Sequence, residues 1–259
     1  MKDKIISMIS TSCPFRGSLH WYDCTDSTNT QAKLLAQQGA PHGTVVIAGS
    51  QTQGRGRMGR QFASPQSGLY FSMILRPDCP PTELMHLTCC AGIAACNAVE
   101  KVTGIRPGIK WINDLVYQGK KLGGILSELS IDPKTGLTDY AIVGIGINCM
   151  EIPEAVADMA TSLREITGRP VLPATVAAAL TEALWQMDTE LLSNRQRLME
   201  IYRRDCITLG KPVKLLGTDI QATAMDVTDQ GALTIRLPGG SVQEVSSGEV
   251  SVRGLYGYL

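Results

Sequence analysis

Up to about residue 209, apolar residues recur every three or four positions in several stretches, which is the spacing of amphipathic helices. Helices are expected to begin near Ser27, Thr82 and Pro173, and a further helical run passes through Leu198, Ile201 and Tyr202. Ser27 can cap the first helix, and Gly39 can end it in the left-handed conformation. Gly104 can close the second. Each helix has an apolar face that is expected to cover a sheet.

Short runs of β-branched and apolar residues predict the strands of that sheet. The runs are Thr44–Gly49, Leu69–Leu75, Ile109–Trp111, Leu115–Tyr117, Leu122–Leu129 and Tyr140–Ile147. Turn signals at Gln118–Gly119 and Asp132–Gly136 join consecutive runs by short connections. Because parallel neighbours need a long crossover, these connections predict a mixed or antiparallel sheet.

From Gly210 the pattern changes to short strands that are separated by glycine and aspartate. The expected strands are Val213–Leu216, Ala222–Asp226, Ala232–Leu237, Val242–Val245 and Glu249–Arg253. We therefore predict a larger domain over residues 1–209, with residues 1–17 as an N-terminal extension. A small all-β barrel is predicted over residues 210–259.

Composition excludes several classes of protein. The 24 basic and 24 acidic residues cancel, so no overall field attracts nucleic acid or an anionic membrane. The longest apolar runs are of strand length, far short of the roughly 20 residues of a membrane span. The eight cysteines form no CxxC and no Cys/His metal pattern, which favours free thiols in the reducing cytoplasm.

The segment Gly54–Arg60 (GRGRMGR) places three arginines and three glycines within seven residues. This composition disfavours a helix or a central strand and predicts a mobile loop. Glycine lets backbone N–H groups approach an anion, and the guanidinium matches carboxylate and phosphate oxygens. A solvated basic loop and a nucleic-acid contact are the alternatives that its composition leaves open.

Three further segments combine polar or charged groups with predicted strands. Lys110–Asp114 (KWIND) follows a strand, where its side chains can converge on a cleft, although Asn-Asp also favours a simple turn. Lys120–Leu126 (KKLGGIL) enters a strand with two glycines, and its alternative is a hairpin with solvated lysines. Gly144–Asn148 (GIGIN) alternates glycine with isoleucine. Glycine inside a strand often marks the close approach of a ligand or of another backbone.

These segments occur in an order that resembles the bacterial biotin protein ligases over roughly residues 20–255. The resemblance also includes Asp26–Asn29 (DSTN), Gln51 and Gly248–Arg253. It implies an α+β fold, with a mixed or antiparallel sheet covered by helices as in the class II synthetase-like ligases, followed by an SH3-like β-barrel. Lipoate ligases share this fold, but the GRGRMGR and KWIND pair resembles the biotin branch.

The resemblance implies a two-step reaction. Biotin attacks the α-phosphate of MgATP to give biotinyl-5′-AMP, and a lysine of a biotin carboxyl carrier domain then attacks this mixed anhydride. ATP, Mg²⁺ and biotin are thus implied as co-substrate, metal and substrate, without a permanently bound cofactor or a covalent enzyme intermediate. The residues agree, since no Ser/His/Asp or Cys/His pattern is present.

The resemblance also implies roles for individual residues. Lys121, Arg55 and Asp114 would be catalytic, and Asp114 would also be a weak metal ligand. Biotin would contact Ser27, Thr28, Asn29, Gln51, Arg55, Gly56, Arg57, Lys121 and Gly123. The nucleotide would contact Arg57, Arg60, Phe62, Lys110, Asn113 and Asn148. Lys120 would be a solvated neighbour of Lys121.

Two positions depart from the family pattern. Ile112 stands where proline is common, and Phe62 stands where tryptophan is common, which leaves less surface to stack on adenine. Fewer than about 25 residues precede Asp26, which is short for a helix-turn-helix module, so specific DNA binding is not expected. The β-rich edges leave a homodimer open. A non-catalytic module that binds nucleic acid through the Gly/Arg segment is the competing hypothesis, and the neutral charge and scarce aromatic residues argue against it.

Overall fold

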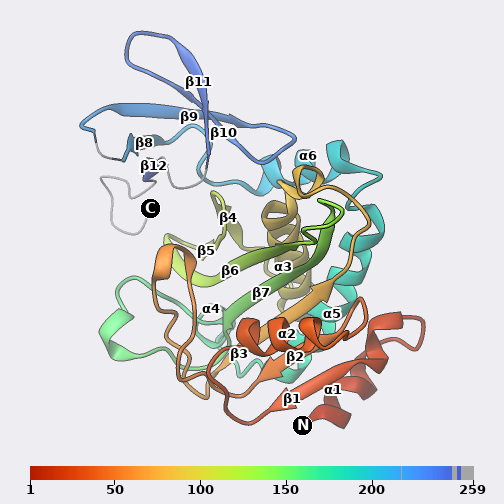
Figure 1. The fold of residues 1–259 in the computed structure, drawn as a ribbon. Coiled ribbons are helices and arrows are strands. Elements are labelled where there is room, and N and C mark those ends of the chain that lie inside the picture. The colour runs from red at the N-terminus through yellow and green to blue at the C-terminus, as the bar shows by residue number, and fades with distance from the viewer. Residues whose placement is uncertain (217, 247–249, 252–259) are drawn as a thin grey trace.

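The computed structural model describes residues 1–216, 218–246, 250 and 251. In this part of the chain a seven-stranded sheet carries helices on both faces, and a five-stranded sheet follows it. Figure 1 shows the smaller sheet above one end of the larger one. The predicted α+β class with an all-β C-terminal part is confirmed.

The larger sheet is mixed, as predicted. Its strands are β1 (Leu19–Tyr22), β2 (Val45–Ala48), β3 (Gly68–Leu75), β4 (Gly108–Lys110), β5 (Asp114–Tyr117), β6 (Lys120–Ile131) and β7 (Thr138–Asn148). The order across the sheet is β1-β2-β3-β7-β6-β5-β4, in which β1 and β2 are parallel and the other neighbours antiparallel. β1 was not predicted, since its residues LHWY include none of the β-branched residues that mark the other strands.

The helices are α1 (Lys2–Met8), α2 (Thr28–Gln37), α3 (Leu87–Thr103), α4 (Leu163–Thr167), α5 (Pro173–Glu190) and α6 (Arg195–Asp205). The predicted helix start near Thr82 is wrong, since Pro81–Leu84 forms a separate 3-10 turn and α3 begins at Leu87. The 3-10 turn winds more tightly than an α-helix and is separated from α3 by Met85 and His86. Leu84 at the end of the turn and Leu87 at the start of α3 are both buried. Gly104 ends α3 with a positive φ, as predicted.

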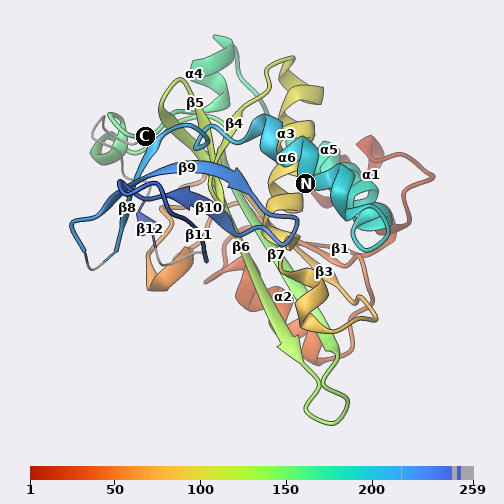
Figure 2. The same ribbon diagram turned by 90° about the horizontal axis from the view of Figure 1, so that it is seen from above.

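The two faces of the larger sheet are covered unequally. α3 and α5 pack together over one face, where the main core lies, and α2 covers part of the other (Figures 1 and 2). Residues 1–17, expected as an extension, form α1 and a 3-10 turn, and they contribute Ile5, Ile9 and Phe15 to the main core. The part of the second face beyond α2 is left for a binding site.

The C-terminal strands are β8 (Pro212–Leu215), β9 (Gln221–Val227), β10 (Leu233–Arg236), β11 (Val242–Val245) and β12 (Val250–Ser251). They pair antiparallel in the order β11-β10-β9-β8-β12. Buried residues of this sheet, such as Leu233 and Ile235, belong to the same hydrophobic cluster as the main core. The predicted strand Glu249–Arg253 is described only at residues 250 and 251, and the remainder of Gly248–Arg253 lies outside the described residues.

Among the described residues, no helix has both the length and the apolar character to cross a bilayer. All eight cysteines are free thiols, and only Cys24 is exposed. Burial raises the pKa of the Cys96 and Cys149 thiols to about 12, so these two side chains act as small apolar groups.

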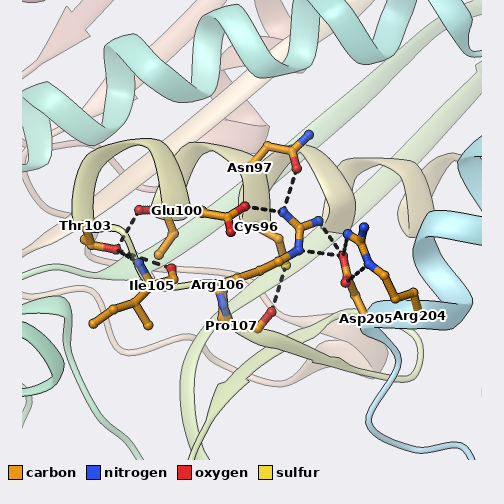
Figure 3. A network of polar contacts seen from close by, with 10 residues as sticks. Cys96, Asn97, Glu100, Thr103, Ile105, Arg106, Pro107, Arg204 and Asp205 are labelled. Atoms are coloured by element: carbon orange, nitrogen blue, oxygen red, sulfur yellow. Dashed lines mark hydrogen bonds and ion pairs between the residues drawn. The ribbon is translucent and has the colours of Figure 1, made fainter.

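A charged cluster joins α3 to the end of α6 (Figure 3). Arg106 donates through Nε to Asp205 (3.0 Å) and through Nη1 to Asn97 (2.9 Å) and Glu100 (2.7 Å). Arg204 donates to the other oxygen of Asp205 at 2.8 Å. Burial acts to raise the pKa of Asp205, but the two arginines outweigh it, and the pKa lies below its usual value. The buried carboxylate therefore stays charged and fixes α6 beside the approach to β4.

Replacing Asp205 with asparagine is expected to cost about 2 kcal/mol of unfolding free energy, because the half-buried Arg106 loses its buried charged partner and keeps only the more exposed Glu100. A carboxylate with a lowered folded-state pKa stabilises the fold above its unfolded pKa of about 4, and this contribution is lost as pH falls through the folded-state value. Chemical denaturation at pH 7 and at steps down to pH 3 would show the wild-type advantage shrinking. Asp219→Asn, which removes an exposed pair with Lys214, is the control and is expected to change little. An equal advantage at all pH values would contradict the interpretation.

Candidate active site

The floor of the site is the part of the sheet face beyond α2. Ser72 of β3 donates to Thr28 Oγ1 (2.8 Å) and Asn29 Oδ1 (2.7 Å) of α2, so it points to this face. Because side chains alternate along a strand, Tyr70 points to the same face. The register places Gly144 of β7 opposite Ser72 and Gly146 opposite Tyr70. Two polar side chains thus lie beside two positions without a side chain.

These two glycines leave room for groups that descend onto the sheet. A Cβ on Gly144 would overlap the amide of Asn29, and one on Gly146 would lie 2.6 Å from the ring of Phe62. Ile145, between them, points into the main core on the opposite face. The close approach that the glycines of Gly144–Asn148 predicted is therefore made by the side chains of Asn29 and Phe62.

A cavity opens above this floor, and the space between its walls, including the open mouth, is about 450 Å³. Its wall includes the following predicted site residues: Ser27, Thr28, Asn29, Gln51, Arg55, Phe62, Asn113 and Lys121. The remaining wall is mainly the backbone and apolar side chains of β6 and β7 together with Tyr70. Burial raises the pKa of Tyr70 far above its usual value, and its hydroxyl donates to Pro65 O at 2.7 Å. The cavity is small, narrow and lined by neutral hydrogen-bonding groups at the α2 end.

A second cavity adjoins the first, and the space between its walls, including the open mouth, is about 1280 Å³. Its wall is apolar on the side of the segment that follows β7, with Ile152, Pro153, Val156 and Met159. Asn148, a predicted nucleotide contact, lies on its wall. Phe62 and Lys121 line both cavities, so an ammonium group and an aromatic ring stand at their junction.

The backbone N–H groups at the N-terminus of α2 are bound by the side chains of Asp26 and Gln51, and not by that of the cap residue Ser27. Ser27 occupies the cap position as predicted, but within the described part of the chain its side chain makes no capping hydrogen bond. Gln51 Oε1 instead accepts from Thr28 N at 2.8 Å, and Asp26 Oδ1 accepts from Ser27 N at 2.6 Å. Burial acts to raise the pKa of Asp26, and hydrogen bonds from Gln31 and Ser27 outweigh it and lower the pKa. The Ser27 hydroxyl is therefore not engaged in capping.

The arginines of the Gly/Arg loop reach the sheet at two places. Arg55 donates through both terminal nitrogens to Glu128 of β6, at 2.9 and 3.1 Å. Arg57 Nη1 donates to Asn113 Oδ1 at 3.2 Å. Burial lowers the pKa of Arg57, the charge of Asp114 opposes this effect, and Arg60 adds to it. The expected mobile loop is thus attached across the cavity in this structure.

Lys121 is held by Asp114, the other strand residue that was expected to be catalytic. Its Nζ lies 2.6 Å from Asp114 Oδ1, and its ammonium group is 5.8 Å from the centre of the Phe62 ring. The bulge between β5 and β6 pairs Val116 with Lys121 and Leu115 with Gly123. This irregularity displaces Lys121 from the regular alternation at the entrance of β6.

Several predicted site residues do not line either cavity: Gly56, Arg57, Arg60, Lys110, Asp114 and Gly123. Lys110 is buried in β4, Arg60 is exposed, and Gly123 packs against the backbone of Gly146. Gly124, and not Gly123, faces the first cavity. Lys120 is exposed, as expected for a solvated neighbour of Lys121, and its Nζ also donates to Ala157 O at 2.9 Å.

Three polar residues at the site, Tyr70, Ser72 and Glu128, were missed. Ser72 lies in a strand whose eight residues are all buried, where the sequence gives no signal for a polar contact. Glu128 could have been found, since it lies four positions after Gly124 on the same face of β6.

Comparison with known proteins gives consistent matches. Residues 21–148 match the Biotin/lipoate A/B protein ligase family, and residues 208–253 match the Biotin protein ligase C terminal domain. The Bifunctional ligase/repressor BirA of Bacillus subtilis is 33% identical, over 90% of this chain and 74% of its own length. The Biotin--[acetyl-CoA-carboxylase] ligase of Mycobacterium tuberculosis is 32% identical, over 87% of this chain and 85% of its own. The biotin protein ligase of Aquifex aeolicus in complex with biotin and ATP superposes with a TM-score of 0.76, 34% identity and coverage of 90% and 97%.

Gly144→Ala is expected to destabilise the fold by about 1–3 kcal/mol, because the added methyl group collides with the buried Asn29 amide. Equilibrium unfolding in denaturant measures the change. Gly239→Ala is a matched control, since a Cβ there meets nothing within 4 Å and its φ is not positive. Equal stabilities for the two variants would contradict the proposed packing of β7 against α2.

Proposed function

The chain belongs to the biotin protein ligases of the biotin/lipoate A/B protein ligase family, and we propose that its two adjoining cavities hold biotin and ATP. The observation that carries this assignment is the position of Lys121 and Phe62 on the walls of both cavities. Two anions that must react with each other, a carboxylate and a phosphate, would meet at this junction. A single ammonium group there can attract both.

The first cavity suits the ureido ring and the apolar chain of biotin. Ser27, Thr28, Asn29 and Gln51 offer short donors and acceptors at the α2 end, where a ureido group needs both. The walls towards the junction are formed by Gly124, Ile125 and Gly146 among others and suit a hydrocarbon chain. A ligand placed this way directs its carboxylate towards Lys121.

The second cavity suits the nucleotide. Its apolar wall can receive a purine, and Phe62 and Asn148 stand between that wall and Lys121. Gly146 lets the Phe62 ring lie close to the sheet, so the ring is fixed between the two ligands.

The chemistry follows from placing the two ligands at the junction. A carboxylate oxygen of biotin attacks the α-phosphorus of ATP, the bond to the bridging oxygen breaks, and pyrophosphate leaves. Lys121 and Arg57 compensate the negative charge that accumulates during this step. In the second step, the amine of a carrier lysine attacks the acyl carbon, AMP leaves and an amide forms.

Magnesium fits this site only as a partner of ATP. Among the described residues, no group of three or more His, Cys, Asp and Glu side chains could hold a metal ion. Mg²⁺ commonly keeps several waters and binds one or two carboxylates together with substrate phosphates, and Asp114 can supply one carboxylate. When bound, the ion would neutralise phosphate charge and assist the departure of pyrophosphate.

The partner is a biotin carboxyl carrier protein or domain. Reduced cysteines and the use of ATP support a cytoplasmic location, and the neutral net charge supports the absence of specific DNA binding.

β1 lies at an edge of the larger sheet, where a second copy of the chain could pair with it to form a homodimer. Sedimentation measures whether this homodimer forms.

Incubation with biotin, MgATP and a purified carrier domain is expected to add one biotinyl group to one carrier lysine. Intact mass spectrometry followed by peptide mapping measures this addition. An unmodified carrier would overturn the proposal. Lipoate in place of biotin tests the ring pocket, and equal modification by both acids would contradict the assignment of the first cavity.

Lys121→Ala is expected to lower the rate of adenylate formation by at least about 100-fold, because the two reacting anions lose their common counter-charge. Pyrophosphate release with biotin and ATP, without carrier, isolates this step. Lys134→Ala, in the turn between β6 and β7, is the control and is expected to keep the wild-type rate. A Lys121 variant with the wild-type rate would show that the junction has another source of positive charge.

A further inference from the structure

Three charge-assisted hydrogen bonds converge on Glu128 of β6. Its two carboxylate oxygens accept from the two terminal nitrogens of Arg55, at 2.9 and 3.1 Å. The same Oε2 accepts from Asn29 Nδ2 at 2.8 Å. One side chain of the sheet thus contacts both the Gly/Arg loop and the first turn of α2.

The contact with Asn29 determines how this amide is oriented. Asn29 Nδ2 donates to Glu128 and to Leu126 O, and Asn29 Oδ1 accepts from Ser72 Oγ. Because the amide nitrogen faces two groups that can only accept, the reversed orientation would lose both of these hydrogen bonds, whereas the Ser72 hydroxyl could pair with either end of the amide. The orientation of a group on the cavity wall is therefore set by β6.

The contact with Arg55 is the stronger of two attachments of the loop to the sheet. The paired arrangement of a guanidinium and a carboxylate is stronger than the single bond from Arg57 to the neutral amide of Asn113. The other loop contacts, such as Phe62 N to Gly54 O at 2.9 Å, are formed within the loop and do not fix it to the sheet.

We propose that Glu128 is a positioning residue that holds the Gly/Arg loop closed over bound biotin and presents the Asn29 amide to the ring of the ligand. This inference rests on the proposed function. Glu128 does not line either cavity and is not a catalytic residue. It acts through Arg55 and Asn29, the two side chains with which its carboxylate forms hydrogen bonds.

Glu128→Gln tests the proposal, because it keeps the shape of the side chain and removes the charge that Arg55 pairs with. The dissociation constant for biotin is expected to rise about tenfold, while the affinity for ATP stays within twofold of wild type. Bound biotin is expected to protect the wild-type loop from trypsin cleavage after Arg55, Arg57 and Arg60. That protection is expected to be lost in the variant.

Arg55→Gln removes the other, more exposed partner of the pair, and with it a side chain on the wall of the first cavity. The double variant is expected to bind biotin no more weakly than the worse single variant, since both changes remove one interaction. Asp139→Asn is the matched control: it removes a similar arginine–carboxylate pair with Arg76 (3.1 Å), away from both cavities. It is expected to leave biotin affinity and loop protection unchanged.

The outcomes separate the two levels of the argument. If the wild-type protein binds no biotin in calorimetry, the proposed function and this inference both fail. If it binds biotin and Glu128→Gln or Arg55→Gln has the wild-type affinity and protection, only the role of Glu128 is overturned. Equal losses for biotin and ATP, or additive losses in the double variant, would also overturn it, since they indicate a general structural role.

Discussion

The site depends on the alternation of side chains along β7, where glycine and isoleucine occupy opposite faces. Ile145 and Ile147 belong to the main core, and Gly144 and Gly146 leave the opposite face without side chains. Asn29 and Phe62 can therefore lie directly on the sheet. A shift of one residue in the register would place isoleucine in the cavity and glycine in the core, so core packing and site geometry specify the same register.

Hydrogen bonds from distant segments then fix the polar groups around this floor. Gln51 holds Thr28, Ser72 holds Asn29, and Glu128 holds both Asn29 and Arg55. Orienting these groups before a ligand binds reduces the cost of ordering them on binding. Few charged side chains are needed where the two cavities meet, since Lys121 lines both of them.

The C-terminal sheet reaches the site through the turn between β4 and β5. Trp111 Nε1 donates to Gly231 O at 3.0 Å, and Trp111 N donates to Thr208 Oγ1 at 2.8 Å. The hydroxyl of Tyr202 in α6 donates to Ile112 O at 3.3 Å. The same turn carries Asn113, the partner of Arg57, so the small sheet and α6 support the residue to which the loop attaches.

Local patterns in the sequence determined the mixture of helices and strands, the strands from β2 onward in the larger sheet and the segments that form the site. The spacing of apolar residues, the positions of glycine and the clustering of charges can all be recognised within a few neighbouring residues. The resemblance to the biotin protein ligases singled out Ser27–Asn29, Gln51, Arg55 and Lys121 before any geometry was known. Only the tertiary structure decided that Gln51 caps α2, that Gly124 rather than Gly123 faces the cavity and that Glu128 holds Arg55. These outcomes depend on strand register, a bulge and contacts between residues 23 and 73 positions apart, which no local pattern contains.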